Sequence, residues 1–206
     1  DRGADYILSR QQLDGSWRPD EHKYTSGQTG LCLYTLLKAG ISPRHPSIVR
    51  GIAYLRSHPP RWTYGIACCL MALQTANPKE YAAEIEEWTG LLLECQGVGF
   101  SYPGSHEDLS LTQYGCLGLR AAEAAGLEMP EEVWEDAIDF ALRVKRGDGS
   151  FGSQLGTEGL GWNDPAINSN AVEGLTASRR GATRPMRERI YGAIEAARSC
   201  HLAALP

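Results

Sequence analysis

Apolar residues recur along this chain with the period of an α-helix. In the segment 130–145 they return at intervals of three and four, which places them in one stripe on a helix surface. The residues of this stripe are Val133, Trp134, Ala137, Ile138, Ala141 and Val144. No segment shows sustained alternation with a period of two, the pattern of a half-buried strand. The chain is therefore predicted to be all-α.

Two kinds of helical run alternate. One kind starts with or beside proline, which suits a first helical turn, and carries charges on one face. These runs are 46–57, 78–95, 130–145 and 184–200. The other kind is rich in small residues and has few charges in its middle; these runs are 25–40, 63–76, 108–126 and 166–181. We predict that the first kind are outer helices facing water and that the second kind are inner helices packed on several sides. Together with a first helix that ends before Gln11, these eight runs give nine predicted helices.

The inner runs end on residues that tolerate a left-handed backbone. Gly40, Gly126 and Gly181 end three of them, and Asn77 follows the fourth. Such residues commonly cap the carboxyl end of a helix in the left-handed conformation. We predict that conformation at all four ends.

A turn motif recurs behind the outer helices. "QQLDGSW" (11–17) and "KRGDGSF" (145–151) share an Asp-Gly turn, and "CQGVGF" (95–100) keeps the glutamine, a glycine and the aromatic residue. Asp-Gly predicts a tight turn with glycine at positive φ. We expect the glutamine to bond backbone groups of an adjoining helix end and the aromatic ring to fill the wedge between hairpins. This structural role is assigned to Gln12, Gly15, Trp17, Gln96, Gly99, Phe100, Gly149 and Phe151.

The aromatic residues after the outer helices mark an internal repeat. Trp17, Trp62, Phe100 and Phe151 are separated by 45, 38 and 51 residues. This spacing is typical of helical hairpins stacked side by side. Trp62 belongs to a degenerate copy, because "YLRSHPPRW" keeps the aromatic residue but has neither the glutamine nor the turn glycine.

These motifs carry a family resemblance. "YILSRQQLDGSW" (6–17) resembles the QW repeat of the terpenoid cyclase and protein prenyltransferase superfamily, to which squalene–hopene cyclase belongs. The segment 106–152 is similar to the prenyltransferase and squalene-oxidase repeat proteins of bacteria. The resemblance covers nearly the whole chain and implies one α/α-toroid repeat domain over residues 1–206. A complete toroid of this kind has more helices than nine. We therefore expect an open ring, or one completed by a second copy, a second half-toroid or a further part of the chain, since an exposed apolar helix face favours association.

The acid motif of the cyclases is incomplete in this chain. The resemblance places an Asp-x-Asp-Asp-Thr pattern at "DLSLT" (108–112), where Asp108 and Thr112 match but Ser110 and Leu111 replace the other two carboxylates. A serine is too weak an acid to protonate an alkene or epoxide. We therefore expect Asp108 to be the N-cap of its helix.

The sequence nominates no metal site and no cofactor. The prenyltransferase zinc ligands include an Asp-x-Cys pair, which this chain lacks, and a zinc site needs three or four converging ligands. "CLGLR" from Cys116 does not match the reactive Cys-Gly-Glu-Gln of thioester domains. The loop 152–170 has no phosphate-binding glycine spacing.

Polar residues open each inner helix, and like ends of these helices converge on one mouth in a toroid. The mouth could bind an isoprenoid or another apolar molecule. The residues assigned to such binding are Tyr64, Gln113, Tyr114, Trp162 and Asn168. The alternative is that these groups cap helices and fill the layers between them.

The composition of the chain limits the kinds of partner and the cellular location that we expect. A net charge of −5 argues against nucleic acid as a partner. The six cysteines lack metal spacing and sit among apolar residues, as reduced buried thiols do, so we expect a cytoplasmic protein, either free or peripheral to a membrane. No run could span a bilayer. The chain begins at Asp1, so we expect a trimmed piece of a longer chain or one whose leader is gone.

Three hypotheses for function remain. The first is a binding domain of the cyclase and prenyltransferase superfamily, without cyclase acid or zinc. The second is a terpenoid-cyclase-like enzyme with Asp108 and Asp164 as catalytic carboxylates, whose other residues lie outside this segment. The third is a carbohydrate-active toroid that uses Glu107 or Asp108 with Asp164 as an acid/base pair.

Overall fold

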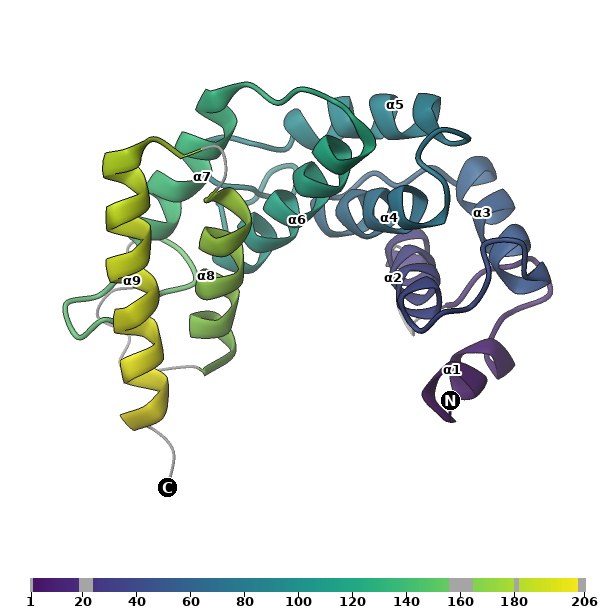
Figure 1. Ribbon diagram of the computed structural model, residues 1–206, viewed down its shortest axis with the longest axis horizontal. Helices are drawn as coiled ribbons and strands as arrows, with labels where there is room; N and C mark the ends of the chain where they lie inside the picture. The colour runs from purple at the N-terminus through teal and green to yellow at the C-terminus, as the bar shows by residue number, and fades with distance from the viewer. Residues whose placement is uncertain (1, 19–23, 156–164, 180–181, 204–206) are drawn as a thin grey trace. The chain divides into compact units, whose positions relative to one another are not determined.

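The computed structural model describes residues 2–18, 24–155, 165–179 and 182–203. In these ranges the chain forms nine α-helices and no strand, so the all-α prediction is confirmed (Figure 1). The helices are α1 (Arg2–Ser9), α2 (Thr25–Lys38), α3 (Pro46–Ser57), α4 (Thr63–Ala76), α5 (Ala82–Leu93), α6 (Leu109–Ala125), α7 (Glu131–Arg143), α8 (Pro165–Ser178) and α9 (Arg184–Ala203). They belong to two compact units.

The first unit holds residues 1–94 and 118–128, and its centre is the contact between α2 and α4. Every residue of α4 from Gly65 to Leu73 is buried, which confirms the predicted packing of this helix on several sides. The reason is its small side chains. A Cβ on Gly27 would lie 2.8 Å from the Cα of Gly65, and one on Gly30 would lie 2.8 Å from the backbone nitrogen of Cys69. The two inner helices therefore touch through their backbones.

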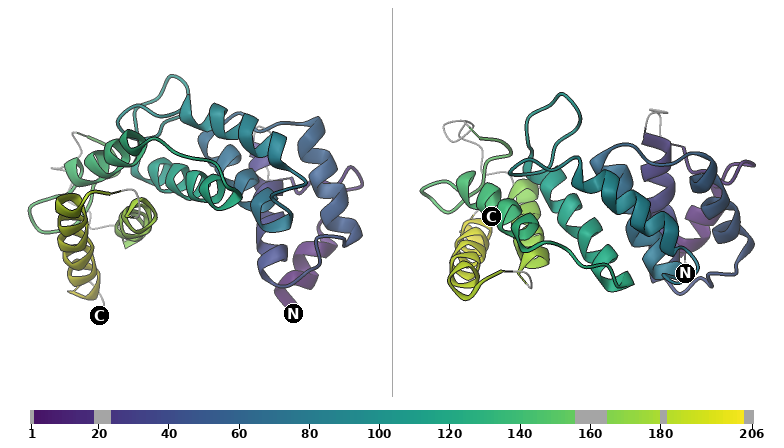
Figure 2. Two further views of the ribbon diagram at one scale, coloured as in Figure 1. Left: turned by 45° about the horizontal axis from the view of Figure 1, so that its top comes forward. Right: turned by 90° about the horizontal axis from the view of Figure 1, so that it is seen from above.

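The second unit holds residues 95–117 and 129–206. Figures 1 and 2 both show α8 and α9 side by side, and α7 contacts both of them. The stripe predicted for α7 faces the interior: its members from Trp134 to Val144 are buried, and Val133 is half-buried. Phe140, Phe151 and Ile190 are fully buried in the same core. The predicted apolar stripe of α7 is therefore confirmed.

Proline starts one outer helix and delays another. Pro46 is the first residue of α3, and the Nδ1 atom of His45 accepts the backbone N–H of Ser47 at 3.2 Å. Pro78 instead opens a turn, and α5 starts only at Ala82. In this turn the side-chain oxygen of Asn77 accepts the N–H of Glu80 at 3.3 Å. The predicted start at 78 is therefore four residues too early.

The ends of the inner helices are partly as predicted. Gly40 and Gly126 have φ values of 87° and 107°, which confirms the left-handed cap at both. The prediction for Asn77 is wrong, since its φ is −170°. The following proline disfavours helical backbone at the preceding residue and favours extended backbone there. Gly181 lies outside the described residues.

None of the helices in the described ranges combines the length and the apolar character needed to cross a bilayer.

Candidate functional site

Two copies of the turn motif have the same geometry. The Oδ1 atom of Asp14 accepts the backbone N–H of Ser16 at 3.0 Å and its hydroxyl at 2.7 Å, and Gly15 has a φ of 92°. In the other copy Asp148 makes the same two bonds to Ser150 at 2.9 and 2.7 Å, around a glycine with a φ of 91°. The bonds from serine lower the pKa of the Asp14 carboxyl to about 2 and also lower the pKa of Asp148. Both carboxylates therefore stabilise their turns as hydrogen-bond acceptors.

A glutamine ties each of two turns to the outer helix that follows. The side-chain nitrogen of Gln11 donates to the carbonyl of Gly15 at 3.0 Å and to that of Ser47 on α3 at 2.8 Å. Gln96 donates in the same way to the carbonyl of Val133 on α7 at 2.8 Å. In the first copy the contact belongs to Gln11, while the exposed Gln12 side chain bonds only the carbonyl of Arg10. The role predicted for Gln12 therefore belongs to its neighbour Gln11. The two residues have the same chemistry, and only the direction of their side chains distinguishes them.

Three aromatic residues of the repeat are buried wedges. Trp17, Phe100 and Phe151 are 4%, 0% and 1% exposed. Each donates its backbone N–H to a side-chain oxygen at the start of an inner helix. The acceptors are Thr29 at 3.0 Å, Thr112 at 2.9 Å and Asn168 at 2.9 Å. Of these acceptors, Asn168 was predicted to line a ligand mouth, whereas it holds the backbone of Phe151. The signal that could have found their role is the spacing of 12 residues between aromatic and threonine in two copies.

Gly99 is required for a reason other than turn geometry. A Cβ at this position would lie 2.6 Å from the ring of Phe140 and 2.8 Å from the hydroxyl of Thr112. These contacts are shorter than real Cβ contacts, so only glycine fits between the ring and the threonine.

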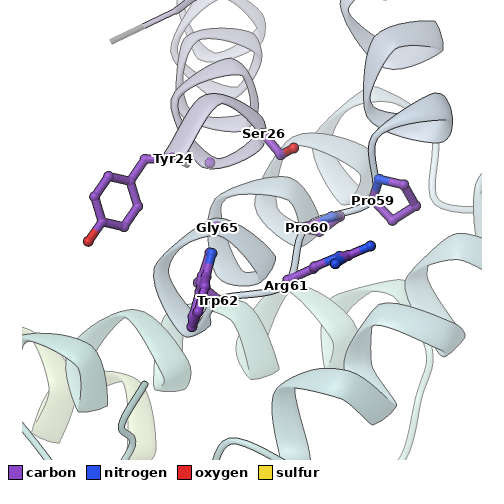
Figure 3. Close-up of a pocket in the computed structure, with 8 residues that line it drawn as sticks. Tyr24, Ser26, Pro59, Pro60, Arg61, Trp62 and Gly65 are labelled. Atoms are coloured by element: carbon purple, nitrogen blue, oxygen red, sulfur yellow. The ribbon is translucent and has the colours of Figure 1, made fainter. Parts of the chain in front are cut away.

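The degenerate copy leaves its aromatic residue in a different place. Trp62 is the N-cap residue of α4 and is half-buried, unlike the three wedges. It lines a pocket at the amino ends of α2 and α4 (Figure 3). We name this the α2–α4 pocket. Its lining residues are Tyr24, Ser26, Gly27, Pro59, Pro60, Arg61, Trp62 and Gly65.

The α2–α4 pocket is small, and hydrogen bonds fix the segments that line it. Its volume is about 90 Å³. The hydroxyl of Ser26 donates to the carbonyl of His58 at 2.8 Å, which ties α2 to the segment before the two prolines. The thiol of Cys69 donates to the carbonyl of Ser26 at 3.4 Å. Together with the glycine contact between the helices, these bonds hold the pocket in shape before any ligand arrives.

Asp108 caps α6. Its Oδ1 atom accepts the backbone N–H groups of Ser110 at 2.8 Å and Leu111 at 3.3 Å, and the hydroxyl of Ser110 also donates to it. The N-cap prediction is therefore confirmed. Its candidate catalytic partner, Asp164, lies outside the described residues, as does Trp162.

The other residues assigned to ligand binding do not gather in one pocket. Gln113 is 7% exposed, and its amide donates to the carboxylate of Glu173 on α8. Asn168 is 1% exposed and holds the backbone of Phe151. Tyr114 is half-buried on α6. Tyr64 is half-buried in the first turn of α4, and a Cβ on Gly27 would lie 3.0 Å from its ring, so it stands next to the α2–α4 pocket.

Two larger hollows also lie in the first unit. One of about 760 Å³ runs along α3 to the turn before α5, where the Arg56 guanidinium bonds Glu84 at 2.5 Å and lies 5.2 Å from the centre of the Tyr81 ring. The other, of about 480 Å³, lies between α1 and α2 and includes Tyr6 and Cys32. The guanidinium of Arg56 in the first hollow is therefore already paired with a carboxylate.

Three of the six cysteines are poorly suited to nucleophilic or metal-binding chemistry. Burial raises the pKa of the Cys32 thiol to about 11 and that of Cys68 to about 12, and the pKa of Cys69 is also well above its usual value. Such thiols stay protonated at neutral pH, whereas nucleophiles and metal ligands are thiolates. In the part of the chain that the structure describes, no group of three or more His, Cys, Asp or Glu residues is arranged to hold a metal ion.

No protein-family model matches this chain, and a search of curated proteins found no match. Kinship with the cyclase and prenyltransferase superfamily is therefore a proposal based on the repeat motifs.

Proposed function

We propose that this chain is a repeat domain of the squalene-cyclase and prenyltransferase type, built on the α/α-toroid plan, which binds an apolar group and catalyses no cyclisation. The observation that carries this proposal is the position of Trp62. Three equivalent aromatic residues are buried and hydrogen-bonded through their backbones, while the fourth lines the α2–α4 pocket. A large aromatic side chain at a concave site is a common anchor for binding.

Two further observations favour binding over cyclase chemistry. The Asp108 carboxylate already accepts two backbone N–H groups, as a cap does, and neither Ser110 nor Leu111 offers an acid beside it. A proton donor for an alkene needs a carboxylic acid kept protonated near the substrate. Asp108 is instead engaged in capping the first turn of α6.

The absence of catalysis is tested with the purified chain. It is incubated with squalene, and separately with farnesyl diphosphate and Mg²⁺, and the products are analysed by gas chromatography with mass spectrometry. We expect no cyclised product. The variants Asp108→Asn and Asp108→Ala are compared by thermal unfolding. Asparagine caps about as well as aspartate, while alanine costs about 1 kcal/mol, so only the alanine variant should unfold at a lower temperature. A product whose formation requires Asp108 would overturn the proposal.

Binding is tested at Trp62 by nuclear magnetic resonance. The indole N–H signal of Trp62, assigned with Trp62→Phe, is followed during titration with 3-methyl-2-buten-1-ol and with farnesol. The test variant is Gly65→Ala. Its new methyl group would lie 3.6 Å from Gly27 and 3.7 Å from Pro60, which are ordinary contacts, and would occupy part of the pocket. The matched control is Gly90→Ala on α5, where a Cβ meets nothing within 4 Å.

Either alcohol, or a proline-rich peptide with flanking glutamates, should shift the Trp62 signal in the unmodified chain and in the Gly90→Ala control. The same probe should shift it less in Gly65→Ala. Both alanine variants should fold at least as stably as the parent, because alanine is the better helix former. The proposal fails if no apolar probe moves the signal, or if Gly65→Ala and Gly90→Ala respond alike.

A further inference from the structure

The size of the α2–α4 pocket limits what it can hold. Pockets that enclose a whole small ligand measure roughly 300–1,000 Å³. At about 90 Å³ this pocket is less than a third of that size. It therefore has room for one side chain or ring, and the rest of the bound molecule must lie outside it.

The walls of the pocket suit a flat, rigid, apolar ring. Tyr24 and Trp62 supply two aromatic surfaces, and Pro59 and Pro60 supply two apolar rings. Figure 3 shows Tyr24 and Trp62 on one side of the pocket and Pro59 and Arg61 on the other. Aromatic-lined grooves of this kind bind proline in extended segments, because such segments are already stiff and lose little conformational entropy on binding.

The charge at the edge of the pocket further limits which molecules can bind there. Among the described residues that line the pocket, Arg61 is the one with a charge, and its side chain is exposed. A guanidinium binds a carboxylate through two parallel hydrogen bonds, with a geometry that lysine cannot reproduce. An anion on the bound molecule therefore complements this edge of the pocket, and a cation is repelled by it.

We infer that the α2–α4 pocket receives a proline ring from an extended segment of a partner protein, which carries a carboxylate beside that proline to pair with Arg61. This inference rests on the proposed binding function and specifies its partner. Trp62 and Tyr24 hold the ring, Arg61 selects the neighbouring acid, and the backbone of Gly65 leaves the space that the ring occupies.

The experiment measures fluorescence anisotropy of three labelled octapeptides with the full chain. The first has four prolines flanked on each side by two glutamates. The second has lysines in place of the glutamates, and the third has alanines in place of the prolines. We expect the first peptide to bind most tightly. Trp62→Ala should weaken it by roughly 30-fold, as expected for a central aromatic anchor. Gly65→Ala should also weaken it while Gly90→Ala does not, which keeps the test valid if Trp62→Ala fails to fold.

The acidic contact has its own test. Arg61→Gln should weaken the glutamate peptide by about 2- to 5-fold, the range of an exposed ion pair, and should reduce the salt dependence of its binding. A peptide with glutamines in place of the glutamates should be unaffected by the same substitution.

The outcomes separate the inference from the proposed function. If farnesol moves the Trp62 signal but no proline peptide binds, the inference is wrong and the binding function stands. If neither probe binds, both are wrong. Equal binding of the alanine and proline peptides would refute proline recognition, and equal binding of the lysine and glutamate peptides would refute the role of Arg61.

Discussion

Replacing Thr29 by valine should destabilise the first unit because it removes the hydrogen bonds between this side chain and Trp17. The hydroxyl of Thr29, a residue that is 0% exposed, accepts the backbone N–H of Trp17 at 3.0 Å and donates to its carbonyl at 3.4 Å. Valine keeps the shape and the branched Cβ of threonine but removes the acceptor. The N–H of Trp17 would then be buried without this bond, which costs about 1–3 kcal/mol. For a chain of this size, that corresponds to a fall in melting temperature of roughly 2–12 °C.

The matched control is Thr35→Val on the same helix. Thr35 is exposed, and its hydroxyl bonds only the carbonyl of Leu31, one turn earlier, at 2.8 Å. A surface change of this kind is expected to stay within about 0.5 kcal/mol. Both variants are measured by thermal unfolding and by urea titration followed by circular dichroism. If they unfold at the same temperature and the same urea concentration, the Trp17–Thr29 bond does not stabilise the fold and the reasoning about the repeat is refuted. Thr112→Val should reproduce the result, since its hydroxyl accepts the N–H of Phe100 at 2.9 Å.

Three further predictions concern the turn and the thiols. Gly15→Ala should lower the melting temperature more than Gly40→Ala: both glycines have positive φ, but only at Gly15 would the Cβ clash, 2.4 Å from a backbone carbonyl of α3. Because the pKa of Asp14 is lowered to about 2, its contribution to the free energy of unfolding is complete above pH 4 and is lost as the pH falls towards 2. This contribution amounts to less than about 1 kcal/mol at this exposed site. Between pH 5 and pH 2 the melting temperature of Asp14→Asn should therefore fall less than that of the parent chain. An equal fall in both would show that the turn is irrelevant to stability. In the native chain at pH 7.5, Cys68 and Cys69 should resist iodoacetamide, and their prompt alkylation, detected by mass spectrometry, would contradict their burial.

The repeat motif was readable in the sequence because its residues act locally. Asp-Gly-Ser forms the same turn in both copies, since the carboxylate, the glycine and the serine that make it are adjacent in the chain. The glutamine was harder to place. Gln11 and Gln12 are neighbours with the same chemistry, and the choice of Gln11 depends on where Ser47, 36 residues further on, is located.

The pocket was less predictable. Trp62 was expected to be a weaker copy of the other aromatic wedges, because its segment lacks the glutamine and the turn glycine. Once the turn is lost, nothing in the sequence states where the ring will lie. Its position beside Tyr24 follows from the backbone contact of Gly27 with Gly65, which brings two segments 38 residues apart to one place.

The sequence by itself determined the helical class, the apolar stripe of α7, the caps at Gly40, Gly126 and Asp108, and the two Asp-Gly-Ser turns. These features depend on interactions within a few residues, where spacing and backbone preference suffice. Only the tertiary structure decided that Thr29, Thr112 and Asn168 hold buried aromatic residues, and that Trp62 lines a pocket. Those outcomes depend on which helices pack against each other, and that depends on the whole core.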